Sequence, residues 1–157
     1  MAVYSVSGQL ATLSASLKSA IVISNAASAM RRFKIFDINV SQGSAPASTD
    51  TNIEFILNRF TGSAPTGTAF TPSPADIADA ATTTTCAVNC TIEPGTITAN
   101  QLFDMFLNQR APYRWQTYLG SGAELVMPAT ASIGCTLRTQ SAGYTGSGGG
   151  TIFYQEQ

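Results

Sequence analysis

Apolar and polar residues alternate with a period of two along much of this chain of 157 residues. The alternation is clearest in residues 52–60, 85–93 and 132–141. Strict alternation over four to eight residues is typical of a β-strand with one buried face. The residues expected on the buried faces of these three segments are Ile53, Phe55 and Leu57; Cys86, Val88, Cys90 and Ile92; and Ile133, Cys135 and Leu137.

Four further segments are strand candidates. Residues 31–40, RRFKIFDINV, are rich in β-formers, but their apolar positions change parity between Ile35 and Phe36. A β-bulge at this point, or burial of both faces, would explain the change. Residues 151–157 are expected to form the last strand. The weaker candidates are VYSVS at 3–7 and SAIVIS at 19–24.

Two segments depart from the alternation. Residues 73–81, SPADIADAA, place Ser73 as an N-cap, Pro74 at the first helical position and Asp76 in the first turn. These positions predict one or two helical turns. Residues 98–109, TANQLFDMFLNQ, fit either a helix or a strand.

About eight short strands joined by polar loops predict an all-β fold. We expect an antiparallel, jelly-roll-like sandwich, with other sandwiches or a barrel as alternatives. The glycine-rich residues 141–150, SAGYTGSGGG, are expected to form a mobile loop. Residues 31–157 are expected to form one domain. Residues 1–30 are expected to be an N-terminal arm or first strands that contribute to assembly.

The only tryptophan, Trp115, lies in PYRWQTYL at 112–119. The alternation there places Trp115 with Tyr113 on one face, and Arg114 with Tyr118 on the other. We therefore predict a strand with a buried tryptophan, paired in a hairpin with 120–128. The alternative is a ligand platform, which needs basic and aromatic groups on one face.

Charge is scarce in this chain. Asp, Glu, Lys and Arg make up 11% of the residues, with 8 basic and 9 acidic residues and a net charge of −1. An ordinary soluble domain carries roughly 25%. A surface with so little charge suits a protein that packs against other subunits, although an ordinary β domain with few charges remains an alternative. No whole-chain field would attract nucleic acid or an anionic membrane.

No segment of the sequence reaches the roughly 20 apolar residues that span a bilayer. The apolar run at 19–30 lies too far from the N-terminus for a signal peptide. We therefore expect a protein that is soluble and not exported.

Catalytic chemistry has few candidates in the sequence. The chain has no histidine, which excludes Ser-His-Asp and Cys-His catalysis. Its nine acidic residues are scattered, and no pair is marked out as the two carboxylates of a glycosidase. We predict no catalytic residue, no cofactor and no metal ligand.

The three cysteines, Cys86, Cys90 and Cys135, are too few for a zinc site that lacks histidine. Four residues of strand span about 13 Å, whereas bridged Cα atoms lie about 4.4–6.8 Å apart, which argues against a Cys86–Cys90 disulfide. We expect three buried thiols in a reducing compartment.

One local concentration of positive charge comprises Arg31, Arg32 and Lys34. A solvated strand start is the expected role. Contact with a nucleic-acid backbone or an acidic partner, or an ion pair between subunits, are the alternatives.

Several segments together resemble small structural proteins encoded by tailed bacteriophages. The most particular are RFKIFDI at 32–38, NRFTGSAPTGTAFTP at 58–72, NQRAPYRW at 108–115 and GAELVMPAT at 122–130. The chain from Arg31 to the C-terminus is similar to the β-rich, jelly-roll decoration or cement proteins of phage heads. None of these segments is a catalytic motif, so no functional residue is carried over.

The resemblance implies a virion role. We expect a non-enzymatic decoration protein, a homotrimer on the outer surface of the head that binds the major capsid protein after assembly in the host cytoplasm. We expect neither nucleic acid nor a membrane as a partner. Removal of residues 1–25 is expected to abolish trimerisation or head binding.

Two other functions are weaker hypotheses. One is a glycan-binding or fibre-attachment module that uses Tyr113, Trp115 and Tyr118 with the glycine-rich residues 141–150. The other is a cupin-like enzyme, whose metal site would require histidines that the chain lacks.

Overall fold

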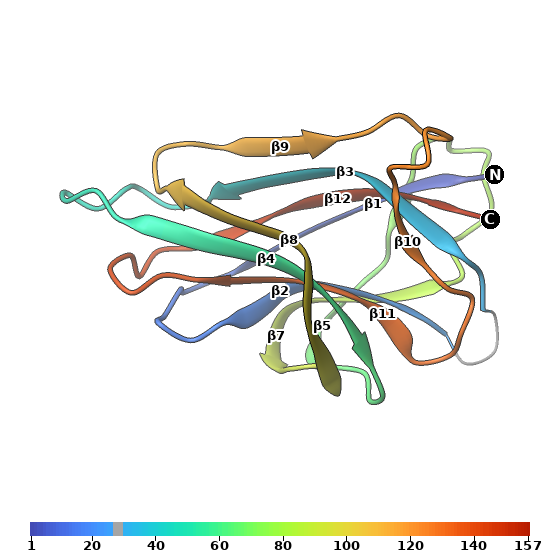
Figure 1. The fold of residues 1–157 in the computed structure, drawn as a ribbon, viewed down its shortest axis with the longest axis horizontal. Helices are drawn as coiled ribbons and strands as arrows, with labels where there is room; N and C mark the ends of the chain where they lie inside the picture. Colours follow the sequence, from blue (N-terminus) through green and yellow to red (C-terminus); the bar gives the residue numbers. More distant parts are fainter. Residues whose placement is uncertain (27–29) are drawn as a thin grey trace.

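The computed structural model describes residues 1–26 and 30–157, and it is all-β. Two antiparallel six-stranded sheets pack face to face (Figure 1). Sheet A contains β10 (Leu125–Met127), β3 (Phe33–Gln42), β12 (Gly148–Glu156), β1 (Val3–Leu10) and β6 (Ser73–Pro74), with β9 (Tyr113–Gln116) also paired to β3. Sheet B contains β5 (Thr66–Phe70), β7 (Thr84–Ile92), β2 (Lys18–Asn25), β11 (Ile133–Gln140), β4 (Asn52–Thr61) and β8 (Thr96–Asn108). The predicted antiparallel β-sandwich is confirmed.

The strands β1 to β4 alternate between the two sheets. The last two strands, β11 and β12, are each inserted between two of these four strands. β1 and β3 lie in sheet A on either side of β12, while β2 and β4 lie in sheet B on either side of β11. Crossing repeatedly between two sheets is compatible with the expected jelly roll. The jelly-roll form itself stays a prediction.

The described part of residues 1–30 lies within the sandwich and is not a separate arm. β1 pairs with β12 from Val3 opposite Gln155 to Leu10 opposite Gly148. β2 lies between β7 and β11. Of the two alternatives expected for this segment, the structure shows the first strands. The contribution of the segment to assembly stays a prediction.

The core fills the space between the inner faces of the sheets. Its largest fully buried side chains include Tyr154 and Phe33 from sheet A, and Phe55 and Leu57 from sheet B. Tyr154 lies edge-on to Phe33, with ring centroids 5.5 Å apart. Full burial of one such side chain stabilises the fold by roughly 1.5–3 kcal/mol, so this alternation decides which face of each strand turns inward.

The predicted irregularity in β3 is a β-bulge. Asp37 lies opposite Phe153 and Ile35 lies opposite Tyr154, so Phe36 is the extra residue. The bulge lets Ile35 and Ile38 both point into the core despite the parity change, and both are fully buried.

The predicted core-facing side of β7 is correct for Cys86 and Val88 and wrong for Cys90 and for Ile92, which is exposed. Cys86 packs into the main core, whereas Cys90 joins a second, smaller cluster with Val22 and Phe60. The cause lies at Asn89, whose φ of 50° places it in the left-handed region. This irregularity turns the side chains after Asn89 to the opposite face of the sheet.

The helical turns predicted at 73–81 are wrong. Ser73 and Pro74 form the short strand β6 beside β1, and the Ala75 amide donates to the Val3 carbonyl at 2.8 Å. Pairing with β1 takes the place of a first helical turn. Asp76 then accepts the Ala78 amide through its side chain, which forms a tight turn.

Two other expectations are settled by the strand pairing. The ambiguous residues 98–109 lie almost entirely in the strand β8. The predicted hairpin of β9 with β10 is wrong, because each pairs separately with β3.

The glycine-rich residues 141–150 are only partly the loop that was expected. Gly148, Gly149 and Gly150 open β12, between β1 and β3. A Cβ on Gly149 would lie 2.1 Å from the Gly8 carbonyl oxygen, and one on Gly150 would lie 2.0 Å from that of Asn39. Glycine is needed because the neighbouring backbones approach so closely.

Deletion of residues 1–25 is predicted to abolish folding itself. The deletion removes a strand of each sheet and exposes β12 and β11 along edges that are now paired. Far-ultraviolet circular dichroism and thermal unfolding, with the full chain in parallel, will test this. A cooperative unfolding transition in the truncated chain would contradict the prediction.

The three thiols are predicted to be unreactive in the folded protein. Cys86, Cys90 and Cys135 are free and buried. Burial raises the pKa of Cys86 to about 12 and that of Cys90 to about 11, and it also raises that of Cys135. A thiol must ionise to attack Ellman's reagent, so at pH 8 the native chain should react only after denaturant is added. Rapid reaction of the native chain would contradict this.

Candidate interaction surface

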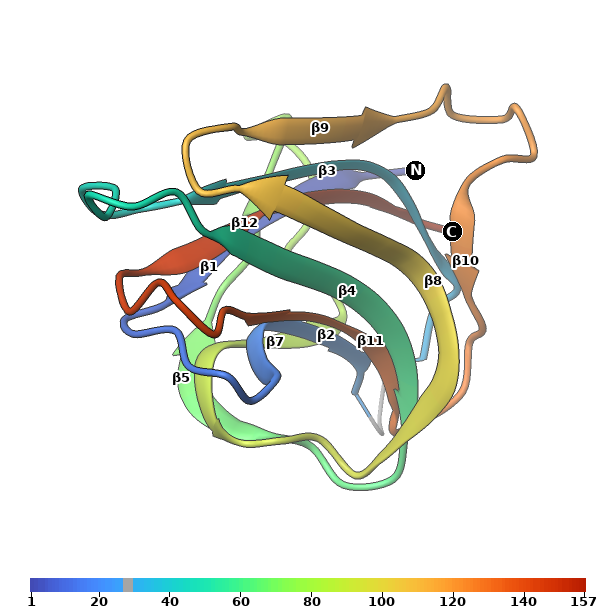
Figure 2. The same ribbon diagram turned by 60° about the vertical axis from the view of Figure 1, so that its left-hand side comes forward.

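β8 and β9 are the outermost strands of the two sheets on one side of the sandwich (Figure 2). A short turn at residues 109–112 joins them. Residues directly opposite each other on paired strands point to the same face of a sheet. On β8, Phe103, Met105 and Leu107 lie opposite Leu57, Phe55 and Ile53, which are core residues. Their side chains therefore point toward the space between the sheets.

β9 contributes two aromatic side chains to the same side. Tyr113 lies opposite Val40 and Trp115 lies opposite Ile38, both buried in the core. The rings of Tyr113 and Phe103 lie 6.2 Å apart, so they make contact across the gap between the sheets. The predicted inward direction of Trp115 is confirmed.

These side chains form what we call the β8–β9 seam. It comprises Phe103, Met105, Leu107, Tyr113 and Trp115. Their partners on β4 and β3 are at most 1% exposed, whereas Tyr113 is 38% exposed and the other four are half-buried. Trp115 is therefore less buried than predicted, because β9 is the edge of its sheet. A row of inward-facing apolar side chains that one chain covers incompletely is typical of an interaction surface.

Charged groups beside the seam are neutralised within the chain. Arg114 forms a two-pronged ion pair with Asp37, with Nη2 and Oδ2 2.5 Å apart. Arg110 pairs with Asp50 at 2.7 Å. The hydrogen bonds of these pairs raise the pKa of Arg114 and lower the pKa of Asp50. An apolar centre with a polar rim is the usual anatomy of a protein interface.

The turn between β8 and β9 is anchored by Gln109. Its side chain is buried, accepts the Ala47 amide at 3.0 Å and donates to the Thr49 carbonyl at 2.9 Å. Its backbone amide donates to the Thr51 carbonyl at 2.9 Å. These bonds fix the start of β9, so the two halves of the seam hold their positions relative to each other.

The aromatic residues of the glycan hypothesis are not brought together. Trp115 and Tyr113 point between the sheets, whereas Tyr118 is 87% exposed in the loop after β9. Gly148–Gly150 are built into β12. Arg114, which a platform would use, is engaged by Asp37.

The loop that carries Tyr118 is held by Glu124. The Glu124 carboxylate accepts the amides of Gly120 and Gly122, and Lys34 lies 3.8 Å away. A hydrogen bond from its own backbone amide, then the one from Gly120, the charge of Lys34 and the bond from Gly122 lower the pKa of Glu124. Of the basic group noted in the sequence, Lys34 thus pairs within its own chain, while Arg31 and Arg32 are exposed before β3. This arrangement fits the solvated strand start.

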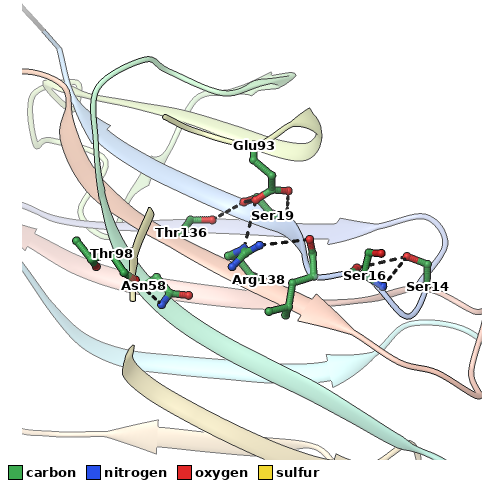
Figure 3. A network of polar contacts seen from close by, with 9 residues as sticks. Ser14, Ser16, Ser19, Asn58, Glu93, Thr98, Thr136 and Arg138 are labelled. Atoms are coloured by element: carbon green, nitrogen blue, oxygen red, sulfur yellow. Dashed lines mark hydrogen bonds and ion pairs between the residues drawn. The ribbon is translucent and has the colours of Figure 1, made fainter. Parts of the chain in front are cut away.

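One acidic residue, Glu93, lies in a network of polar side chains that resembles a catalytic or binding site (Figure 3). Its carboxylate accepts the Ser19 amide at 2.8 Å and the Ser19 hydroxyl at 2.6 Å, and Arg138 Nε lies at 3.3 Å. Ser19 also shares a hydrogen bond with Thr136 at 2.6 Å. Both carboxylate oxygens are thus occupied by donors of the chain. The network fastens the β7–β8 connection over the outer face of β2 and β11.

The buried carboxylate of Glu156 is also occupied by donors of the chain. It accepts the amides of Thr83 and Thr84 at 3.0 and 3.1 Å, and the hydroxyls of Thr82 and Thr83. These bonds tie the end of β12 to the start of β7. Within residues 1–26 and 30–157, no group of three or more Cys, Asp or Glu side chains could hold a metal ion.

Comparisons of the chain with protein-family models, with curated proteins and with solved structures find no match. Within the described segments, no helix has the length and apolarity needed to cross a membrane.

The β8 half of the seam was missed in the sequence because residues 98–109 also fit a helical face. A signal was present. Phe103, Met105 and Leu107 are apolar at a spacing of two, as Tyr113 and Trp115 are a few residues later. Exposed Phe106, the second aromatic residue of β8, interrupts that alternation and completes the helical pattern.

Acrylamide quenching of Trp115 is predicted to lie between that of a solvated and that of a buried tryptophan. Tyr113 is the neighbour of Trp115 on the same face of β9, so Tyr113→Ala should increase quenching by opening the seam. Tyr118→Ala is the matched control and should leave quenching unchanged. Equal quenching in all three proteins would contradict the assigned position of Trp115.

Proposed function

We propose that this protein is a non-enzymatic structural protein of a phage virion, a homotrimeric decoration protein that binds and stabilises the capsid shell. The observation that carries the proposal is the β8–β9 seam, an apolar surface that the chain leaves partly uncovered. The resemblance of residues 31–157 to head decoration proteins supports the proposed place of the protein in a phage virion. The location is the outer surface of the head, after assembly in the host cytoplasm.

The distribution of charge supports a role in packing against other proteins. Only 11% of the residues are charged, and the ion pairs at Asp37, Asp50, Glu93 and Glu124 engage both acidic and basic groups within the chain. Little charge then has to be desolvated when a partner covers the surface. Low desolvation cost favours an assembled subunit.

The arrangement of carboxylates supports a non-enzymatic role. A general acid or base needs a carboxyl group that can reach a substrate. Glu93 and Glu156 instead bind backbone amides and hydroxyls of their own chain. Their chemistry serves to hold strands together.

Decoration would act by bridging. Each copy covers several neighbouring capsid subunits, and an interface of standard size buries about 1,600 Å² in total. Many copies linked on one lattice strengthen the shell even where each contact is modest. A sandwich whose first and last strands are paired along their full length is a stiff element for this purpose.

The test combines mass and binding. Light scattering of the purified protein should give the mass of a trimer, and mixing with undecorated heads should give saturable co-sedimentation. Heads that already carry their decoration protein are the control and should bind no more. A protein that stays in the supernatant at every concentration would overturn the proposal.

A further inference from the structure

A groove of about 290 Å³ lies on the outer face of sheet B, where β4 begins. Its lining includes a row of three side chains on β8, β4 and β11, because Phe106 and Gln140 each lie opposite Glu54. Ile53 and Phe55, the neighbours of Glu54 along β4, belong to the core, so the row points away from it. Adjacent strands lie about 4.8 Å apart, so an aromatic ring, a carboxylate and an amide follow one another in steps of that size.

The aromatic member of the row, Phe106, is 65% exposed. A single exposed apolar side chain is common on proteins and has no meaning by itself. Here the ring lines a concave surface together with hydrogen-bonding side chains. Apolar surface combined with a few convergent polar groups is the usual composition of a small-molecule site.

The walls of the groove are held in place by Ser141. Ala15 lines the groove from the loop before β2, and Ala142 lines it from the loop before β12. The buried Ser141 donates its amide to the Ser14 carbonyl at 2.8 Å and its hydroxyl to the Asn52 carbonyl at 2.7 Å. These bonds fasten both loops to the start of β4. A preformed groove loses little conformational entropy when a ligand binds.

The polar groups of the groove favour a neutral ligand that donates hydrogen bonds. The Gln140 side-chain amide donates to one Glu54 oxygen, which leaves the other Glu54 oxygen and the Gln140 carbonyl oxygen to accept from a ligand. Asn52 adds a second side-chain amide. Among the described residues, no Lys or Arg lines the groove. A phosphate or an acidic sugar would therefore meet the Glu54 charge without a compensating cation.

We infer that this groove binds a neutral sugar ring. One face of a pyranose carries C–H groups that pack on the electron-rich face of an aromatic ring. Its rim carries hydroxyl groups, which donate strong hydrogen bonds to a carboxylate. Phe106 supplies the first contact, and Glu54 and Gln140, one and two strands away, supply the second. The groove is small for a ligand site, so it takes one ring of a chain whose other units extend into solvent.

The site is separate from the glycan platform considered from the sequence. Tyr113 and Trp115 point between the sheets, whereas Phe106 points outward on β8, with its hydrogen-bonding partners on the next two strands. The inference goes beyond the proposed decoration of the capsid and does not depend on it. In a decoration protein, such a groove would hold the head against a polysaccharide.

Saturation-transfer NMR with glucose, galactose, mannose and N-acetylglucosamine, followed by an array of neutral and acidic oligosaccharides, tests the site. At least one neutral sugar should receive saturation, chiefly at the ring protons of one face. Phe106→Ala should weaken its binding by about tenfold, the effect of losing one aromatic contact. Glu54→Gln should also weaken it, because the charge of the acceptor is lost.

Two matched controls lie outside the groove. Tyr118→Ala removes another exposed aromatic ring, and Asp104→Asn neutralises another exposed acid on β8. Both variants should bind the sugar as the native chain does. Phe106 is exposed, so Phe106→Ala should keep the native thermal unfolding transition.

Three results would overturn the inference. They are the absence of binding to every neutral sugar tested, unchanged binding in Phe106→Ala, and tighter binding of acidic than of neutral glycans. Co-sedimentation with undecorated heads keeps this site apart from the proposed function. A protein that binds a sugar but no heads would contradict decoration alone, and one that binds heads but no sugar would contradict the sugar site alone. Loss of head binding in a folded Phe106→Ala would make the groove a capsid contact and also overturn the inference.

Discussion

The rest of the structure depends on the packing of two apolar sheet faces against each other. Side chains such as Phe55 and Tyr154 are buried only because both sheets supply an inner face. On the side of β1 and β7 the sheets are in contact and the core is closed. On the side of β8 and β9 the same inward-facing pattern runs out to the edge of both sheets. The seam is therefore the core continued to the surface, and its apolar character follows from the fold.

Three carboxylates, two of them buried, hold together segments that apolar packing alone would not fix. Glu156 joins the end of β12 to the start of β7, Glu93 fastens the β7–β8 connection, and Asp37 holds β9 against β3 through Arg114. A buried charge is costly unless donors surround it. The donors to Glu156 and Asp37 come from the segment being held, whereas the donors to Glu93 come from β2 and β11, against which its own segment is held. Several of the few charges of this chain thus serve as polar anchors between strands.

Period-two alternation predicted the sandwich, and the parity change at Phe36 predicted its bulge. Features that depend on one backbone angle or on distant pairing were not predictable in this way. Cys90 changes sides because of the conformation of Asn89, and β9 and β10 choose β3 over each other. The seam required both strands to be known, since Phe103 and Tyr113 become neighbours only once two edges are aligned. The apolar residues of the seam can be recognised in the sequence, but their incomplete burial cannot be predicted from it.

The pairing of β1 with β12 has a consequence for biosynthesis. Val3 must find Gln155, and β6 pairs only with Tyr4 and Ser5, so most of β1 stays unpaired until β12 has been made. Closing so long a loop is entropically costly, and folds dominated by such distant contacts fold slowly. While the chain emerges from the ribosome, β1 and β2 are unpaired strands open to aggregation. The sandwich is therefore expected to close only once β12 has left the ribosome, and quaternary assembly can begin only then.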